Sequence, residues 1–231
     1  MLTAETRLVA LLGHPVSHSL SPRMQNAAFA ARGLDWAYVA CDVAPERVEA
    51  ALRGLVALEF AGANVTIPHK LAVAALCDEA EGESVNTVVV RDGRLLGFNT
   101  DRAILDGIAS RRACVIGAGG AAAALRPALD EVRVFSRRGE WPPDAGGCDL
   151  IVNATPVRDE LLVQPERGQA VVDLAYGPGE TALVAAARAA GCEVVIDGRE
   201  ALVRQGAAAF ERWTGVPAPV DVMRAALGLR P

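Results

Sequence analysis

The sequence predicts an α/β protein in two parts, because short β-branched runs alternate with helix-like segments along the chain. In the second half this alternation is regular, which indicates βαβ units and a parallel sheet. In the first half two such runs flank Asp92-Gly93, a dipeptide typical of a type I′ hairpin turn. We therefore expect an N-terminal α/β part with an antiparallel addition, followed by a part built on a parallel sheet.

The first part begins with an apolar run over residues 7–12 that predicts a buried strand. Ser21-Pro22 then has the pattern of a helix start, with Ser21 as N-cap and Pro22 in the first helical position. Apolar spacing and turn residues place the remaining elements of this part. The expected strands are 36–41, 62–67, 87–90 and 94–98, and the expected helices are 21–32, 45–55 and 68–77.

The second part is expected to contain strands over residues 113–116, 132–136, 149–152, 170–174 and 193–196. Ala-rich stretches over 120–129 and 181–190 predict helices between some of them. A helix over 101–112 is expected to bridge the two parts, so the first domain is predicted to end at residue 101 and the second to begin at residue 102.

Composition excludes several classes of protein. The net charge of −5 and the lack of a basic stripe argue against nucleic-acid binding. The sequence has no apolar run of membrane-spanning length and no signal-peptide pattern, which predicts a cytoplasmic protein. Five dispersed cysteines favour thiols in a reducing compartment over disulfides, and the three histidines lack metal-ligand spacing, so no metal site is expected. The five cysteines are Cys41, Cys77, Cys114, Cys148 and Cys192.

A glycine-rich segment follows the predicted strand 113–116 directly. It reads Gly117-Ala118-Gly119-Gly120-Ala121-Ala122 and fits the dinucleotide fingerprint G-x-G-x-x-G/A of the Rossmann fold. Its position between a strand and a helix gives the backbone access to a pyrophosphate at the helix N-terminus. The alternative is a glycine-rich turn that binds nothing.

The end of the next strand bears on which dinucleotide is bound. NAD sites usually place an acidic residue there, whereas this chain has Ser136-Arg137-Arg138. Two guanidinium groups and a hydroxyl suit the 2′-phosphate of NADP, so the sequence favours NADP over NAD. The alternative is that both arginines are solvated surface charge.

Lys70 is the only lysine in a chain with 23 basic residues, and it follows the predicted strand 62–67. Lysine can act as a general acid or base where arginine cannot, because arginine stays protonated. Asp101 ends the first part and is predicted to face Lys70, so the two can relay the proton that reduction of a ketone requires. The alternative is a surface lysine beside a helix-capping aspartate.

Hydroxyl and amide side chains gather in the same part of the sequence. Ser19 and Ser21 lie at a strand-to-helix turn, Asn64 and Thr66 precede Lys70, and Asn86 precedes the hairpin. Together they suit a polyhydroxylated substrate. Ser19 and Ser21 also have a purely structural interpretation, as a turn residue and an N-cap.

The motifs taken together resemble one family, shikimate dehydrogenase. The resemblance spans nearly the whole chain in family order. It rests on GHPVSHSLSP (13–22), NVTIPHK (64–70), VNT (85–87), GFNTD (97–101), GAGGAA (117–122), SRR (136–138), NATP (153–156), DLAYGPGET (173–181) and DGREALVRQGAAAFERWTG (197–215).

The resemblance implies an enzyme that reduces 3-dehydroshikimate to shikimate with NADPH, on the route to chorismate and the aromatic amino acids. It implies a substrate domain over 1–101, joined by C-terminal helices over 205–231, and a Rossmann NADP domain over 102–204. Lys70 and Asp101 become the catalytic pair. The implied substrate-binding residues are Ser19, Ser21, Asn64, Thr66, Lys70, Asn86, Asp101, Tyr176 and Gln205. The implied cofactor-binding residues are Gly117, Ala118, Gly119, Gly120, Ala121, Ser136, Arg137, Arg138, Asn153, Ala154, Thr155, Pro156, Leu174 and Gly198.

Some residues depart from the family pattern. The chain is shorter than is typical, with trims before Ser84, within 101–112 and after Pro156, where Val157-Arg158-Asp159 replaces a glycine-containing loop. Gln25, Ser136 and Ala201 stand where the family commonly has His, Asn and Met. Two alternatives therefore stay open, an NAD-dependent quinate/shikimate dehydrogenase and a non-catalytic relative. The oligomeric state is expected to be a monomer or a homodimer.

Overall fold

The structure is a computed structural model that describes residues 2–110 and 112–230. It divides into two compact units: unit 1 is Met1–Ala103 with Val203–Pro231, and unit 2 is Ile104–Leu202. Each unit contains its own sheet with helices, so the predicted α/β class is confirmed. Residues 1, 111 and 231 of the predicted domains lie outside the described residues. That the first domain binds the substrate and the second binds NADP stays a prediction.

The sheet of unit 1 is mixed, in the order β2-β1-β3-β5-β6-β4. Strand β1 pairs in parallel with β2 and β3, whereas β5 runs antiparallel to both β3 and β6. The strands are β1 (Arg7–Gly13), β2 (Trp36–Asp42), β3 (Gly62–Val65), β4 (Glu79–Ala80), β5 (Thr87–Arg91) and β6 (Arg94–Phe98).

The predicted hairpin turn is confirmed. Asp92 has φ of 52° and Gly93 has φ of 72°, and a type I′ turn requires positive φ at both central residues. Strand β4 was not predicted, because Glu79 and Ala80 have neither β-branching nor alternation and their pairing depends on β6.

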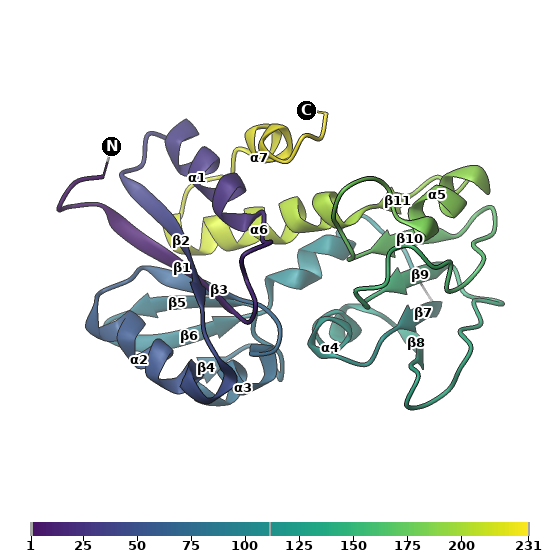
Figure 1. Cartoon of the computed structure of the whole chain (residues 1–231), viewed down its shortest axis with the longest axis horizontal. Coiled ribbons are helices and arrows are strands. Elements are labelled where there is room, and N and C mark those ends of the chain that lie inside the picture. The colour runs from purple at the N-terminus through teal and green to yellow at the C-terminus, as the bar shows by residue number, and fades with distance from the viewer. Residues whose placement is uncertain (1, 111, 231) are drawn as a thin grey trace. The chain divides into compact units, whose positions relative to one another are not determined.

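Helices cover both faces of this sheet (Figure 1). The helices α2 (Val48–Ala57) and α3 (Lys70–Leu76) bury Leu52 and Val73 against one face. The helices α1 (Ser21–Ala31) and α6 (Gly198–Thr214) pack on the other, where the rings of Phe29 and Phe210 stack with centroids 5.4 Å apart. A short 3₁₀ helix, η1 (Pro45–Arg47), precedes α2, and α7 (Val220–Ala226) is the last helix of the described residues.

Three local predictions are wrong. Ser21 is the first residue of α1 rather than its N-cap; the N-cap is Leu20, which makes no side-chain cap bond. The helix expected from Pro68 begins at Lys70, because residues 66–69 form a turn first. The bridging helix expected over 101–112 is instead a 3₁₀ helix, η2 (Thr100–Leu105). Its Thr100 NH bonds the Asn86 side chain, and such a tertiary bond leaves no trace in local periodicity.

The sheet of unit 2 is entirely parallel, in the order β11-β10-β9-β7-β8. Strand β7 lies between β8 and β9, so the chain first extends the sheet on one side of β7 and then on the other. Ligands of such sheets bind at the carboxyl ends of the strands at this switch point. The strands are β7 (Arg112–Ile116), β8 (Glu131–Phe135), β9 (Leu150–Asn153), β10 (Ala170–Asp173) and β11 (Val195–Ile196).

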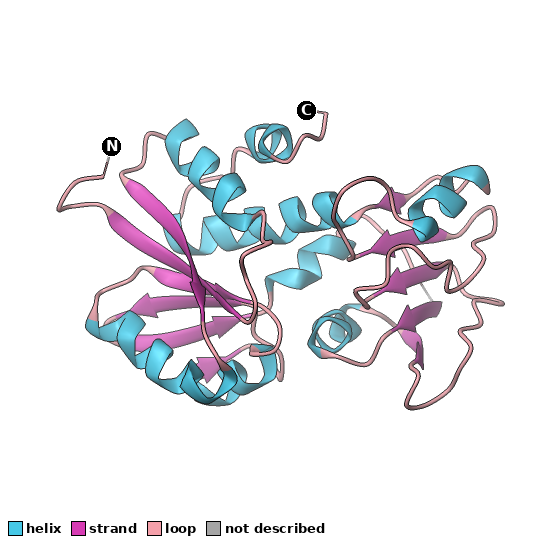
Figure 2. Cartoon of the chain, in the orientation of Figure 1, coloured by secondary structure: helices cyan, strands magenta, loops and turns pink. Residues whose placement is uncertain are grey.

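Few helices cover the sheet of unit 2. Helix α4 (Gly120–Leu125) continues into the 3₁₀ turn η3 (Arg126–Ala128), and α5 (Ala182–Ala189) is capped by the Thr181 side chain. Residues 136–149 and 154–169, which are all described, form loops without a helix (Figure 2). Among the described residues no helix has the length and apolar character needed to cross a membrane.

Candidate functional site

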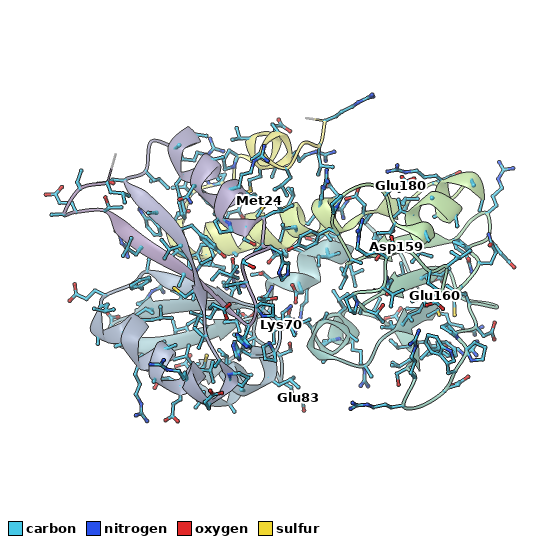
Figure 3. The ribbon with its side chains drawn as sticks, viewed as in Figure 1. Met24, Lys70, Glu83, Asp159, Glu160 and Glu180 are labelled. Carbon is cyan, nitrogen blue, oxygen red and sulfur yellow. The ribbon has the colours of Figure 1, made fainter. Side chains whose placement is uncertain are left out.

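The first cluster of functional side chains is centred on Lys70 and Asp101 in unit 1. Lys70, which is labelled in Figure 3, opens α3 after the turn that follows β3. Asp101 lies in η2 after β6. The Lys70 ammonium donates to Oδ2 of Asp101 at 2.5 Å, and both side chains are about one-tenth exposed. Buried charges of this kind require a partner of opposite charge, and here Lys70 and Asp101 are each other's partner. The alternative of a surface lysine is therefore contradicted.

Asn86 connects this pair to the rest of the cluster. Its Nδ2 donates to Oδ1 of Asp101 at 2.7 Å, so the carboxylate has a donor on each oxygen. Its Oδ1 accepts from the backbone NH of Thr100 at 2.8 Å, which fixes which side of the amide faces Asp101. Nδ2 also lies 3.4 Å from Oε1 of Gln205, one of the predicted substrate residues.

Asn64 lies under the same cluster on β3. Its Oδ1 accepts from the Tyr38 hydroxyl at 2.8 Å, and its Nδ2 donates to the Thr87 hydroxyl at 3.0 Å. The Thr87 hydroxyl in turn lies 2.9 Å from that of Thr100. Sequence reasoning missed Tyr38, Thr87 and Thr100, although Thr87 and Thr100 stand inside the motifs VNT and GFNTD.

The remaining predicted residues of unit 1 have local contacts. The Ser19 hydroxyl accepts from the Ser21 backbone NH at 3.2 Å, as expected of a turn residue, and Ser21 is buried. Thr66 donates its backbone NH to the carbonyl of Leu12 on the neighbouring strand. No contact of these side chains with Lys70 is described, so their role in binding substrate stays a prediction.

His69 is a buried residue of this region and one of the three histidines that lack metal-ligand spacing in the sequence. Only 1% of it is exposed, and its Nε2 lies 2.7 Å from the carbonyl oxygen of Val43. A carbonyl can only accept, so Nε2 carries the hydrogen. The bond ties the residue before Lys70 to the loop after β2, which helps to fix the start of α3.

The second cluster lies in unit 2, at the carboxyl ends of its strands. Gly117 follows β7 with φ of +113°, a conformation that suits glycine, and a Cβ there would lie 3.1 Å from the Ala154 carbonyl. The loops after β7 and β9 are therefore in direct backbone contact at the switch point. Gly119 is the N-cap of α4, and the helix begins at Gly120.

Asn153, at the end of β9, is held by a buried carboxylate. Its Nδ2 donates to Oδ1 of Asp173 at 2.9 Å, and its Oδ1 accepts from both the NH and the hydroxyl of Thr155. Burial raises the pKa of Asp173 above its ordinary value, against the opposing effect of the Thr181 hydroxyl that donates to it at 2.5 Å. Neither Asp173 nor Thr181 was a predicted site residue, although both lie in the motif DLAYGPGET.

The arginines predicted to bind the 2′-phosphate lie in an exposed turn after β8. Arg137 Nη2 is 3.4 Å from Oε2 of Glu160, and its guanidinium lies over the ring of Trp141, 5.6 Å from the centroid. Glu160 comes from the loop after β9 and is marked in Figure 3. The end of β8 lacks an acidic residue, as the sequence indicates. The fold nevertheless brings the carboxylate of Glu160 to Arg137. For Arg138 no side-chain partner is described.

Tyr176, Leu174 and Gly198 also belong to unit 2. Leu174 and Tyr176 lie in the segment after β10, and Gly198 starts α6 against that segment's backbone. Within the described residues no group of His, Cys, Asp and Glu side chains is arranged to hold a metal ion.

Known families match both ends of the chain. The shikimate dehydrogenase substrate binding domain matches residues 11–88, and the shikimate 5′-dehydrogenase C-terminal domain matches residues 198–227. A shikimate dehydrogenase (NADP(+)) of Rubrobacter xylanophilus is 44% identical, over 98% of this chain and 97% of that protein. That alignment runs over 279 positions while this chain has 231 residues, so this chain lacks internal segments that the relative has.

Solved structures agree with the sequence matches. A shikimate dehydrogenase crystallised with NADP+ has a TM-score of 0.87 and 34% identity, covering 98% of this chain and 96% of that one. The shikimate 5-dehydrogenase of Thermus thermophilus, in complex with NADP(H) and shikimate, has a TM-score of 0.84 and 35% identity, covering 96% and 98%.

Proposed function

The chain belongs to the shikimate dehydrogenase family, and from that premise we propose how its residues carry out the reaction. The enzyme reduces 3-dehydroshikimate to shikimate with NADPH, reversibly, in the pathway to chorismate and the aromatic amino acids. It is an NADP-dependent oxidoreductase. The observation that carries its mechanism is the buried contact of 2.5 Å between Lys70 and Asp101.

Lys70 supplies the proton of the reduction. When bound, NADPH supplies a hydride to the ketone carbon, and the oxygen then needs a proton. The Lys70 ammonium has three donor hydrogens, of which one is directed to Asp101, so another is available for the substrate oxygen. In the reverse direction the neutral amine takes the proton from the hydroxyl. Asp101 keeps the ammonium oriented and stabilises its charge.

The polar side chains around the pair orient the substrate. Asn86 and Gln205 come within 3.4 Å of each other beside Asp101, and both combine donor and acceptor groups suited to ring hydroxyls. Asn64, Ser19, Ser21 and Thr66 complete the proposed pocket in unit 1. Tyr176, a residue of unit 2, stays a proposed substrate-binding residue on the family resemblance alone. Hydrogen bonds to hydroxyls discriminate strongly against analogues that lack them, because the protein's buried polar groups are then left unpaired.

The residues at the strand ends of unit 2 fit NADP. Gly117 has the positive φ and the close backbone approach that a pyrophosphate turn needs, and a Cβ on Gly119, the N-cap of α4, would meet no atom within 4 Å. Arg137 and Arg138 are exposed at the end of β8, where the 2′-phosphate is recognised. We assign Gly117–Ala121 to the pyrophosphate and Ser136–Arg138 to the ribose phosphate, and we propose that Asn153–Pro156, Leu174 and Gly198 pass near the cofactor.

The test is oxidation of NADPH or NADH with 3-dehydroshikimate as the substrate. We expect turnover that is faster with NADPH, and kcat lower by orders of magnitude in Lys70→Ala with an unchanged circular dichroism spectrum. Lys70→Arg is the sharper variant, because arginine keeps the charge beside Asp101 but does not release a proton. Near-normal turnover in Lys70→Arg would contradict the proton role. Faster turnover with NADH would contradict the assignment of Arg137 and Arg138.

We also propose that the enzyme works in the cytoplasm as a monomer or homodimer. All five cysteines are free thiols, which is the state a reducing compartment maintains. Light scattering on the purified protein measures the oligomeric state, and a larger assembly would contradict the proposal.

A further inference from the structure

The segment after β10 has an unusual attachment to the rest of unit 2. Residues 174–180 form neither helix nor strand, and their middle reads Gly177-Pro178-Gly179, with φ of +73° at Gly179. Two glycines and a proline offer no side chain that can hold the segment in place. Its conformation therefore depends on groups from outside, and Tyr176, proposed above to bind substrate, lies directly before them.

Two arginines bind the three consecutive carbonyls of this stretch. Arg199 donates to the carbonyl of Gly177 at 3.1 Å, and Arg158 Nη2 lies 2.6 Å from the carbonyl oxygen of Pro178 and 3.4 Å from that of Gly179. Hydrogen bonds from a guanidinium to a carbonyl are charge-assisted and stronger than neutral ones. Arg158 belongs to the loop after β9 and Arg199 to the first turn of α6, so the segment is held from two sides.

The steric fit around the segment is equally close. A Cβ on Gly177 would lie 2.8 Å from the guanidinium carbon of Arg158, and a Cβ on Gly198 would lie 2.5 Å from the carbonyl oxygen of Ala175. Neither glycine has a positive φ, so both positions accept alanine except for these contacts. The segment therefore lies directly between the guanidinium of Arg158 and the backbone of α6.

Both ends of the segment are anchored independently of the arginines. The buried carboxylate of Asp173 accepts from the NH of Ala175 at 3.0 Å and from the Thr181 hydroxyl, and the NH of Ala182 donates to the carbonyl of Arg158 at 2.7 Å. The middle of the segment, with Gly177, Pro178 and Gly179, lies between these two anchors along the chain. The arginines act on that middle.

The position of Arg158 has a cost that its contacts must offset. Its Nε is buried and has no hydrogen-bond partner among the described residues, and an unpaired buried donor is unfavourable. A solvated surface arginine would not adopt this position. The bonds to Pro178 and Gly179 and the contact with Gly177 are the interactions that hold it there.

We propose that Arg158 and Arg199 are positioning residues that fix residues 176–179 and thereby place the Tyr176 side chain for the substrate. The proposal rests on the function proposed above, because it takes Tyr176 as a substrate contact. Small displacements of substrate-positioning groups cost up to about 100-fold in rate. Loss of the Arg158 guanidinium therefore acts on the reaction through Tyr176.

The test compares Arg158→Ala with Arg167→Ala, which removes an exposed arginine of the same unit outside the proposed site. We expect kcat/KM for shikimate to fall roughly tenfold in Arg158→Ala, partial recovery with millimolar guanidinium chloride, and no change in Arg167→Ala. Amide hydrogen exchange over 174–181 should accelerate in Arg158→Ala alone. Amide hydrogen exchange does not depend on turnover. Inactivity of the wild-type protein would therefore contradict the proposed function, whereas the exchange measurement would still test whether Arg158 holds the segment.

A double-mutant cycle tests whether the effect passes through Tyr176. If it does, Arg158→Ala costs little further activity once Tyr176 is replaced by Phe. If the losses of activity in Arg158→Ala and in the Tyr176→Phe variant multiply independently, the proposal is overturned. Faster amide exchange in Arg158→Ala with unchanged kcat/KM would also overturn it. If Arg158→Ala fails to fold, Gly177→Ala serves instead, because its methyl group displaces the Arg158 guanidinium. Unchanged amide exchange and unchanged kcat/KM in Gly177→Ala would also overturn the proposal.

Discussion

Asn86 donates a hydrogen bond of 2.7 Å to Asp101 on the carboxylate oxygen opposite the one that Lys70 binds. The amide cannot turn over, because its oxygen accepts from the backbone NH of Thr100. The residue assigned from the sequence to the substrate alone is therefore also a support of the catalytic pair.

Replacing Asn86 tests this support. In Asn86→Ala the Asp101 carboxylate loses a donor and the Thr100 NH loses an acceptor, so we expect kcat to fall and the free energy of unfolding to drop by about 1–3 kcal/mol. Asn86→Asp keeps the size but places a second negative charge beside Asp101, and its kcat should fall as well. Steady-state kinetics and urea denaturation measure the two effects. A loss confined to KM, with kcat unchanged, would contradict the support of the pair.

The sequence was sufficient for much of the fold because the signals are local. The strand of residues 7–12 is observed as Arg7–Gly13, and the Asp92-Gly93 turn has the predicted backbone conformation. Alternation, β-branching and turn residues depend only on near neighbours, so they can be read without the tertiary structure. The errors occur at η2 and at the starts of α1 and α3, where tertiary bonds and the path of the preceding turn decide the local structure.

The candidate site was predictable to a smaller extent. Lys70 and Asp101 stand out in the sequence by residue type and by position at the ends of predicted elements. Their hydrogen bonds to each other and to Asn86 depend on the register of β3, β5 and β6, which periodicity does not give. The pairing of Arg137 with Glu160 is harder still, because it depends on the path of a loop that has no regular structure.

That ion pair leads to a prediction on cofactor affinity. Glu160 competes with a 2′-phosphate for the Arg137 guanidinium, and its negative charge repels the phosphate. Both side chains are more than half exposed, and such pairs contribute about 0–1 kcal/mol. We expect Glu160→Gln to lower KM for NADPH about two- to fivefold at low salt, with a smaller effect at high salt and no effect on KM for NADH. Glu131→Gln, which removes the exposed pair with Arg112, is the matched control and should change neither KM.

The cysteines offer a prediction on reactivity. Burial raises the pKa of Cys114 to about 12, and burial together with the charge of Asp78 raises that of Cys77 to about 11. Thiols react as thiolates, so both should resist alkylation in the native protein near neutral pH and react after unfolding. Mass spectrometry of peptides after brief iodoacetamide treatment measures this. Rapid native labelling of Cys114 would show that β7 opens far more often than a central strand should.

The buried carboxylate of Asp173 predicts a pH dependence of stability. Burial raises its pKa in the folded state above the unfolded value of about 3.9. Over the interval between the two values the folded state holds more protons than the unfolded state, so the contribution of Asp173 to the free energy of unfolding falls as pH rises. Asp173→Asn lacks this titration. We therefore expect the stability of the wild type relative to the variant to decrease from pH ~4 upward and to level off above the folded pKa. Urea denaturation of both proteins across this range measures the difference. Parallel stability curves would contradict the prediction, because they would show that the hydrogen bonds from Asn153, Ala175 and Thr181 fully offset the desolvation of the carboxylate.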